Sequence, residues 1–126
     1  MESNKLKLII AEDEADMLRL LIRQLSGRFE IIATVKDGRY LVDAAALFRP
    51  DVIVSDVLMP RLTGPQAMQE LKARGHEFPF VFISASTELV REGTYSIVHK
   101  LDIFSELEPA VHAAALGTVY VSQNAR

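Results

Sequence analysis

The sequence has no cysteine, no long apolar run near its start and no excess of positive charge. The absence of cysteine excludes disulfides, thiolate metal sites and a thiol nucleophile. The apolar run at residues 6–11 is too short for a signal peptide or a membrane span, so we expect a cytoplasmic protein without membrane contact. Because the net charge is −3, we expect DNA contact only through a domain absent from this chain.

Length and composition predict a single domain. The chain has 126 residues, of which 49% are hydrophobic and 25% are charged, enough for one buried core and a charged surface. Residues 1–116 contain all the predicted helices and strands and are expected to form the domain. Residues 117–126 have no clear place in this pattern, so we expect a C-terminal extension or the start of a linker.

Short apolar runs alternate with amphipathic segments along the chain. We predict strands at residues 6–11, 29–35, 51–56, 80–84 and 95–99, and helices at residues 15–25, 40–48, 66–73, 87–91 and 103–116. In the last helix, Pro109 is expected in the first turn or at a kink. Strands that are almost continuously apolar indicate a parallel sheet covered on both faces. The predicted fold is therefore a doubly wound, five-stranded α/β domain.

Polar residues stand where the predicted strands end. In such a domain, binding and chemistry gather at the carboxyl ends of the strands. Each of these residues alone has an ordinary explanation, as a helix cap, a turn residue, a small strand-end residue or a surface lysine. Their coincidence at four strand ends favours a common site, formed by Glu12, Asp13, Asp56, Ser84 and Lys100.

The residue types at this site predict phosphoryl chemistry. Clustered carboxylates repel one another, and a hard divalent cation with oxygen ligands, Mg²⁺ or alternatively Mn²⁺, relieves that repulsion. The carboxylate of Asp56 can act as a nucleophile toward phosphorus and form an aspartyl phosphate. The metal, the Lys100 ammonium and the Ser84 hydroxyl would neutralise the charge on the transferred group.

At these residues the sequence resembles the receiver domain of two-component response regulators. The resemblance covers nearly the whole chain and is carried by IIAEDEADM, VIVSDVLMPRLTG, FISAS and the single lysine after the fifth strand. It implies a flavodoxin-like fold with strand order 2-1-3-4-5. It also implies a phosphoacceptor regulatory domain rather than an enzyme with a separate substrate, with phosphoryl transfer and dephosphorylation as its only self-catalysed reactions.

The resemblance also implies a role for each site residue. Asp56 would be the phosphoacceptor, and the donor would be a phosphohistidine on a histidine kinase or a phosphotransfer protein. Ser84 would be the switch hydroxyl, and Lys100 would contact the phosphoryl group. The Mg²⁺ ligands would be Asp13, Asp56, the backbone carbonyl of Leu58 and, through water, Glu12.

The ending LEPAVHAAALGTVYVS resembles receivers that precede a C-terminal helix-turn-helix DNA-binding domain of the LuxR type. This second resemblance implies control of a transcriptional output. Among the expected partners we also include a second copy of the chain, in a homodimer.

The sequence departs from the receiver pattern after the fourth strand. Ser84 and Lys100 are 100 − 84 = 16 positions apart, fewer than receivers usually have, so the helix at residues 87–91 is predicted to be shortened. Leu101 replaces the usual proline after the lysine, which leaves the conformation of this loop open.

A second departure from the receiver pattern concerns the aromatic residue that moves when such a domain is phosphorylated. Ile97 stands where many receivers have an aromatic residue that moves with phosphorylation, so an ordinary aromatic switch is not expected. Tyr95, two positions earlier, is expected to pack in the core or at the sheet edge.

Other functions fit the sequence in different degrees. A receiver-fold interaction module with impaired or atypical switching, and a stand-alone receiver without DNA-binding output, are the alternatives. A haloacid-dehalogenase-type phosphatase would need a second aspartate at the position of Leu58. A nucleotide-binding protein would need a glycine-rich loop where this chain has the acidic residues 12–16.

Overall fold

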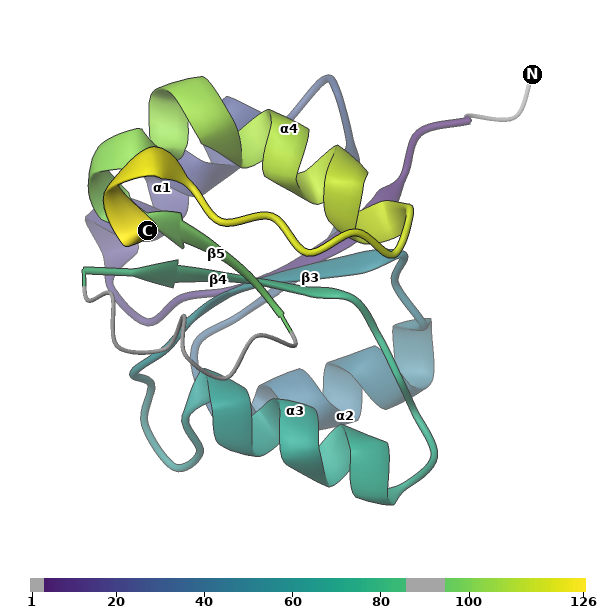
Figure 1. Cartoon of the computed structure of the whole chain (residues 1–126). Coiled ribbons are helices and arrows are strands. Elements are labelled where there is room, and N and C mark those ends of the chain that lie inside the picture. Colours follow the sequence, from purple (N-terminus) through teal and green to yellow (C-terminus); the bar gives the residue numbers. More distant parts are fainter. Residues whose placement is uncertain (1–3, 86–94) are drawn as a thin grey trace.

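The structure, a computed structural model, describes residues 4–85 and 95–126 and has the alternating order of strands and helices that the sequence predicts (Figure 1). Its elements are β1 (Lys7–Ala11), α1 (Ala15–Leu25), β2 (Glu30–Val35), α2 (Gly38–Phe48), β3 (Val52–Asp56), α3 (Gly64–Ala73), β4 (Phe80–Ser84), β5 (Ser96–His99) and α4 (Ile103–Ala115). Two short 3₁₀ turns cover Lys100–Asp102 and Gln123–Ala125. None of the helices in these two ranges has the length and apolar character that a membrane span requires.

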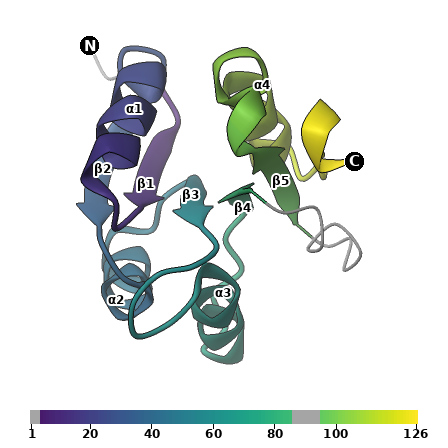
Figure 2. The same ribbon diagram turned by 90° about the vertical axis from the view of Figure 1, so that its left-hand side faces the viewer.

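The five strands form one parallel sheet in the order β2-β1-β3-β4-β5. Helices α1 and α4 cover one face and helices α2 and α3 cover the other (Figure 2). Every residue of β3 and β4 is buried, since these strands lie inside the sheet with helices on both sides. The predicted fold class and strand order are confirmed.

Most predicted boundaries lie within two residues of the observed ones, and the differences have local causes. Helices α2 and α3 begin two residues earlier than predicted, because Asp37 and Thr63 cap them: the Asp37 side chain accepts from Tyr40 N (2.8 Å), and Thr63 forms a capping box with Gln66. Glu14 caps α1, accepting from the amides of Asp16 and Met17.

Helix α4 (Ile103–Ala115) contains a proline. The first-turn position expected for Pro109 is wrong, because Pro109 lies in the interior of α4 and the helix continues past it. Lacking an N–H, Pro109 cannot donate to the carbonyl of Ser105 four residues earlier. The shortened helix predicted at residues 87–91 lies outside the described residues.

The C-terminal residues, which had no clear place in the sequence pattern, lie along β5 (Figure 1). Ile97 N donates to Tyr120 O (2.8 Å) and Ser122 N donates to Ile97 O (3.0 Å), so the segment pairs with the outer edge of the sheet. A parallel bridge joins Ile97 to Val121. We call residues 120–125 the C-terminal strap. Whether it belongs to the domain or begins a linker in a longer protein stays a prediction.

Replacing Thr63 by alanine should destabilise the fold. The change removes the side-chain half of the capping box at the start of α3, where Gln66 N donates to Thr63 Oγ1 (3.1 Å). We expect the free energy of unfolding, measured with urea, to fall by about 1 kcal/mol. Thr63→Ser keeps the hydroxyl and should stay close to wild type. Equal losses in both variants would contradict this account of the cap.

Candidate functional site

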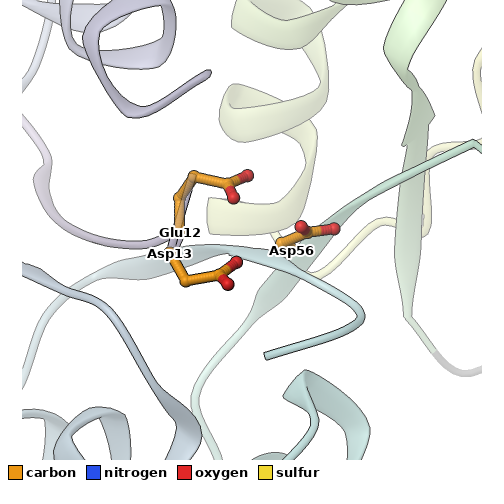
Figure 3. A group of neighbouring side chains, drawn as sticks. All are labelled: Glu12, Asp13 and Asp56. Atoms are coloured by element: carbon orange, nitrogen blue, oxygen red, sulfur yellow. The ribbon is translucent and has the colours of Figure 1, made fainter. Parts of the chain in front are cut away.

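Three carboxylates converge at the carboxyl ends of β1 and β3 (Figure 3). Glu12 and Asp13 directly follow β1, and Asp56 is the last residue of β3. Because β1 and β3 are paired in parallel, their ends meet at the same edge of the sheet. Each residue offers a carboxylate oxygen, and the three oxygens lie within 4.8 Å of one another. The structure therefore brings together the acidic residues that the sequence predicted.

Glu12 is a buried carboxylate with an unused oxygen. Its side chain is 1% exposed, and Oε2 accepts from Glu14 N (3.0 Å). Oε1 is buried and has no hydrogen-bond partner among the residues that the structure describes. The pKa of Glu12 is raised to about 7, chiefly by burial and also by the charges of Asp56 and Asp13, although the Glu14 amide and Lys100 oppose the shift.

Asp56 is the carboxylate that β3 contributes to the cluster. It is 9% exposed, and its Oδ1 accepts from Val57 N (2.8 Å). Burial raises the pKa of Asp56 above its ordinary value, while the Lys100 charge and the Val57 N–H favour the ionised form. One carboxylate oxygen of Asp56 is thus anchored by the backbone, which fixes the direction of the side chain.

Gly64 allows the loop after β3 to pass close to Asp56. A Cβ at Gly64 would lie 2.5 Å from the carbonyl oxygen of Asp56 and 2.9 Å from Ser55 Oγ, distances that are too short for real contacts. Gly64 N donates to Val57 O (2.8 Å), and Ser55 Oγ donates to Asp56 O (2.7 Å). The glycine in the motif VLMPRLTG therefore has a steric reason to be there.

Ser84 and Lys100 come from the next two strand ends. Ser84 is the last residue of β4, 4% exposed, and β4 pairs with β3 so that Ile83 lies beside Asp56. Lys100 begins the 3₁₀ turn after β5, and its charge lowers the pKa of both Asp56 and Glu12. The fold therefore gathers all five predicted residues at one edge of the sheet. Their chemical roles stay predictions.

Of the other residues singled out in the sequence, Leu58 is exposed, whereas Ile97 and Tyr95 are buried. Leu58 follows Asp56 by two residues and its side chain is 73% exposed, so only its backbone could serve the site. Ile97 is fully buried in β5 and belongs to the same core cluster as Tyr95. Tyr95 packs edge-on against Phe82, with ring centroids 5.1 Å apart, which confirms the packing expected for it.

Sequence reasoning missed two residues that hold the turn carrying Lys100. His99 Nδ1 accepts from Leu101 N (3.0 Å), a hydrogen bond that a proline at position 101 could not donate. Asp102, 5% exposed, accepts hydrogen bonds from the side chains of Ser122 and Asn124. The position of His99 directly before Lys100 is the sequence signal that could have found it. No local signal links Asp102 to partners about twenty residues away.

The acidic cluster fits a hard divalent cation. Its donors are carboxylate oxygens, which Mg²⁺ and Mn²⁺ prefer, and Asp13 is exposed, so the group opens to solvent. Within residues 4–85 and 95–126, no protein atom donates a hydrogen bond to the buried Glu12 Oε1. A metal-bound water would satisfy that oxygen, as the sequence-based assignment of Glu12 requires.

Comparisons with known proteins agree on one family. Residues 8–103 match the response regulator receiver domain. The chain is 34% identical over 91 residues to a protein-glutamate methylesterase/protein-glutamine glutaminase of Geobacillus kaustophilus, covering 71% of the chain and 26% of that protein. It is 32% identical over 79 residues to the response regulator MprA of Mycolicibacterium vanbaalenii, covering 63% of the chain and 34% of that protein.

A solved structure agrees in fold. A LuxR-family two-component response regulator from Aurantimonas sp. SI85-9A1 superposes with a TM-score of 0.87 at 16% identity, covering 97% of this chain and 93% of that one. At this identity the likeness shows the fold alone. The chain spans about a quarter to a third of the two curated relatives described above.

The buried carboxylates should make stability fall with rising pH when no metal is present. The unfolded chain loses the Glu12 proton near pH 4.5, whereas the folded chain keeps it until about pH 7. The folded state therefore binds more protons in this window, and its stability declines across it, by at most about 3 kcal/mol for Glu12.

The measurement is urea unfolding at stepped pH in a chelating buffer. Glu12→Gln should reduce the slope without removing it, because the raised pKa of Asp56 acts in the same direction. Glu30→Gln, at an exposed position at the start of β2, should keep the wild-type slope. Identical slopes in wild type and Glu12→Gln would show that burial of Glu12 has no such effect.

Proposed function

The chain belongs to the response regulator receiver domain family, and on that premise we propose that Asp56 accepts a phosphoryl group from a phosphohistidine of a histidine kinase or phosphotransfer protein. The observation that carries the proposal is the acidic cluster at the ends of β1 and β3, with a buried Glu12 oxygen that has no hydrogen-bond partner in the described part of the chain. The positive charge of Lys100 acts on the same cluster. Together these groups supply a nucleophile, a cation site and a counter-charge for phosphate.

The proposed step is an in-line displacement at phosphorus. An Asp56 carboxylate oxygen forms the new O–P bond while the P–N bond to the donor histidine breaks, and the electron pair of that bond stays on the imidazole nitrogen. Since Asp56 Oδ1 accepts from Val57 N, Oδ2 is the oxygen left to attack. Lys100 Nζ and Ser84 Oγ would donate to the oxygens of the transferred group.

The metal ligands would be Asp13, Asp56 and the backbone carbonyl of Leu58, with Glu12 acting through a water. When bound, Mg²⁺ supplies positive charge that neutralises the phosphoryl oxygens. Asp13 is exposed whereas Glu12 is buried, which supports a direct role for Asp13 and a more distant one for Glu12.

Exposed apolar side chains near the site support a protein as the phosphodonor. Leu58 lies in the loop after Asp56, and Leu101 and Phe104 follow Lys100 in the chain. Their side chains are 73%, 76% and 72% exposed. Apolar side chains around a polar site are typical of a surface that a protein partner covers. A free small-molecule donor would not need them.

We further propose that the phosphorylated domain controls a transcriptional output. The relative MprA is described as a response regulator, and the solved structure with a TM-score of 0.87 belongs to a LuxR-family regulator. The likeness to MprA supports a longer response regulator of which this chain would be the receiver part, and the LuxR-type ending of the sequence supports an output that acts on DNA.

Phosphorylation by acetyl phosphate with Mg²⁺ tests the main proposal. Intact-mass measurement should show one added phosphoryl group in the wild type and none in Asp56→Asn, because the amide cannot act as the nucleophile. A chelator should prevent the addition. Asp43→Asn, at an exposed position on α2, is the matched control and should be modified like the wild type. A phosphoryl group that persists in Asp56→Asn would refute the assignment.

A further inference from the structure

The C-terminal strap contacts both ends of the turn that carries Lys100. Ser122, which is fully buried, is the shared contact. Its Oγ accepts from His99 N (2.8 Å) and donates to Asp102 Oδ2 (2.6 Å). One hydroxyl of the strap thus joins the residue before Lys100 to the residue that ends the turn.

Asp102 is held almost entirely by the strap. Oδ2 also accepts from Asn124 N (2.7 Å), and Oδ1 accepts from Asn124 Nδ2 (2.5 Å). Burial would raise the pKa of Asp102, but the hydrogen bonds from Ser122 and Asn124 outweigh burial and keep the pKa below its ordinary value. The carboxylate therefore stays ionised and keeps accepting these hydrogen bonds at neutral pH.

Burial does not fix the turn itself. Lys100 is exposed and Leu101 is 76% exposed, so no core packing holds either residue. The turn has one internal anchor, the hydrogen bond from Leu101 N to His99 Nδ1. His99 is also held by its pairing with Ser84 in β4, and the strap adds the contacts with His99 and with the Asp102 side chain.

A second set of contacts holds the strap without reaching Lys100. Glu106, in the first turn of α4, accepts from Tyr120 Oη (2.9 Å) and from Gln123 N (3.0 Å). Tyr120 N donates to Ser96 Oγ (3.0 Å) in β5. Glu106 therefore holds the strap at Tyr120 and at Gln123, whereas Ser122 and Asn124 are the strap residues that hydrogen-bond to His99 and Asp102.

We propose that the C-terminal strap positions Lys100 for phosphoryl transfer, with Asp102, Ser122 and Asn124 as positioning residues that fix the turn. This inference rests on the proposed function, in which Lys100 contacts the phosphoryl group. It adds that the phosphoryl site is incomplete without residues 120–125, which lie beyond the last helix.

Two variants break the contacts to the turn, and one serves as a matched control. Ser122→Ala and Asn124→Ala remove donors to Asp102, and Asn124 is exposed, so its replacement should not disturb folding. Tyr120→Phe removes a hydrogen bond from the same strap but leaves the Lys100 turn untouched.

The first measurement is amide hydrogen exchange at Leu101, followed by NMR. Exchange of this amide should accelerate about tenfold in Ser122→Ala and Asn124→Ala, corresponding to the loss of one hydrogen bond, and should stay at the wild-type rate in Tyr120→Phe. Equal exchange in all four proteins would overturn the proposal.

The second measurement is the phosphorylation rate with acetyl phosphate at saturating Mg²⁺. The rate should fall about tenfold in Ser122→Ala and Asn124→Ala, while Mg²⁺ affinity, which does not use Lys100, should stay within about twofold. In a Lys100→Ala background, Ser122→Ala should cause no further loss, because both changes act through one group. Additive losses, or an equal loss in Tyr120→Phe, would overturn the proposal.

The two proposals fail in different ways. A wild-type chain that gains no phosphoryl group refutes the proposed function. A phosphorylated wild type with unchanged rates in Ser122→Ala and Asn124→Ala refutes the positioning role of the strap alone.

Discussion

Two of the three carboxylates that meet at the end of the sheet are buried, and the rest of the site depends on that arrangement. Glu12 and Asp56 have lost most of their contact with water, so burial raises the pKa of both carboxyl groups, and the charge of Asp56 adds to the shift of Glu12. Protein atoms offset little of this cost: one backbone amide serves each residue, and Lys100 contributes its charge. A site with this much unbalanced negative charge is suited to take up a cation, and through it a phosphoryl group.

The parallel sheet makes this crowding possible. Parallel strands end at the same edge, so residues far apart in the chain, such as Asp13, Asp56 and Lys100, meet there. The loop after β3 must then pass close to Asp56, and Gly64 permits this because a Cβ would collide with the Asp56 carbonyl. The site therefore lies at the end of a packed core, in which every residue of β3 and β4 is buried.

The C-terminal strap pairs with the outer edge of the sheet and also contacts the turn that carries Lys100. An edge strand has unpaired backbone groups, and here Ile97 satisfies its N–H and carbonyl with Tyr120 and Ser122. The same segment then reaches Asp102 at the end of the Lys100 turn. The chain that leaves the last helix thus lies against the turn that carries Lys100.

The sequence by itself determined the elements and the main site residues, because both follow from local patterns. Apolar runs predicted the strands, and polar residues at their ends predicted the cluster around Asp56, which parallel pairing brings together. Tertiary structure alone decided the place of the C-terminal segment and the partners of Asp102. Those hydrogen bonds join residues about twenty positions apart, such as Asp102 and Ser122, and they depend on how α4 packs against the sheet. Since spacing along the chain does not encode that packing, no sequence pattern could have revealed them.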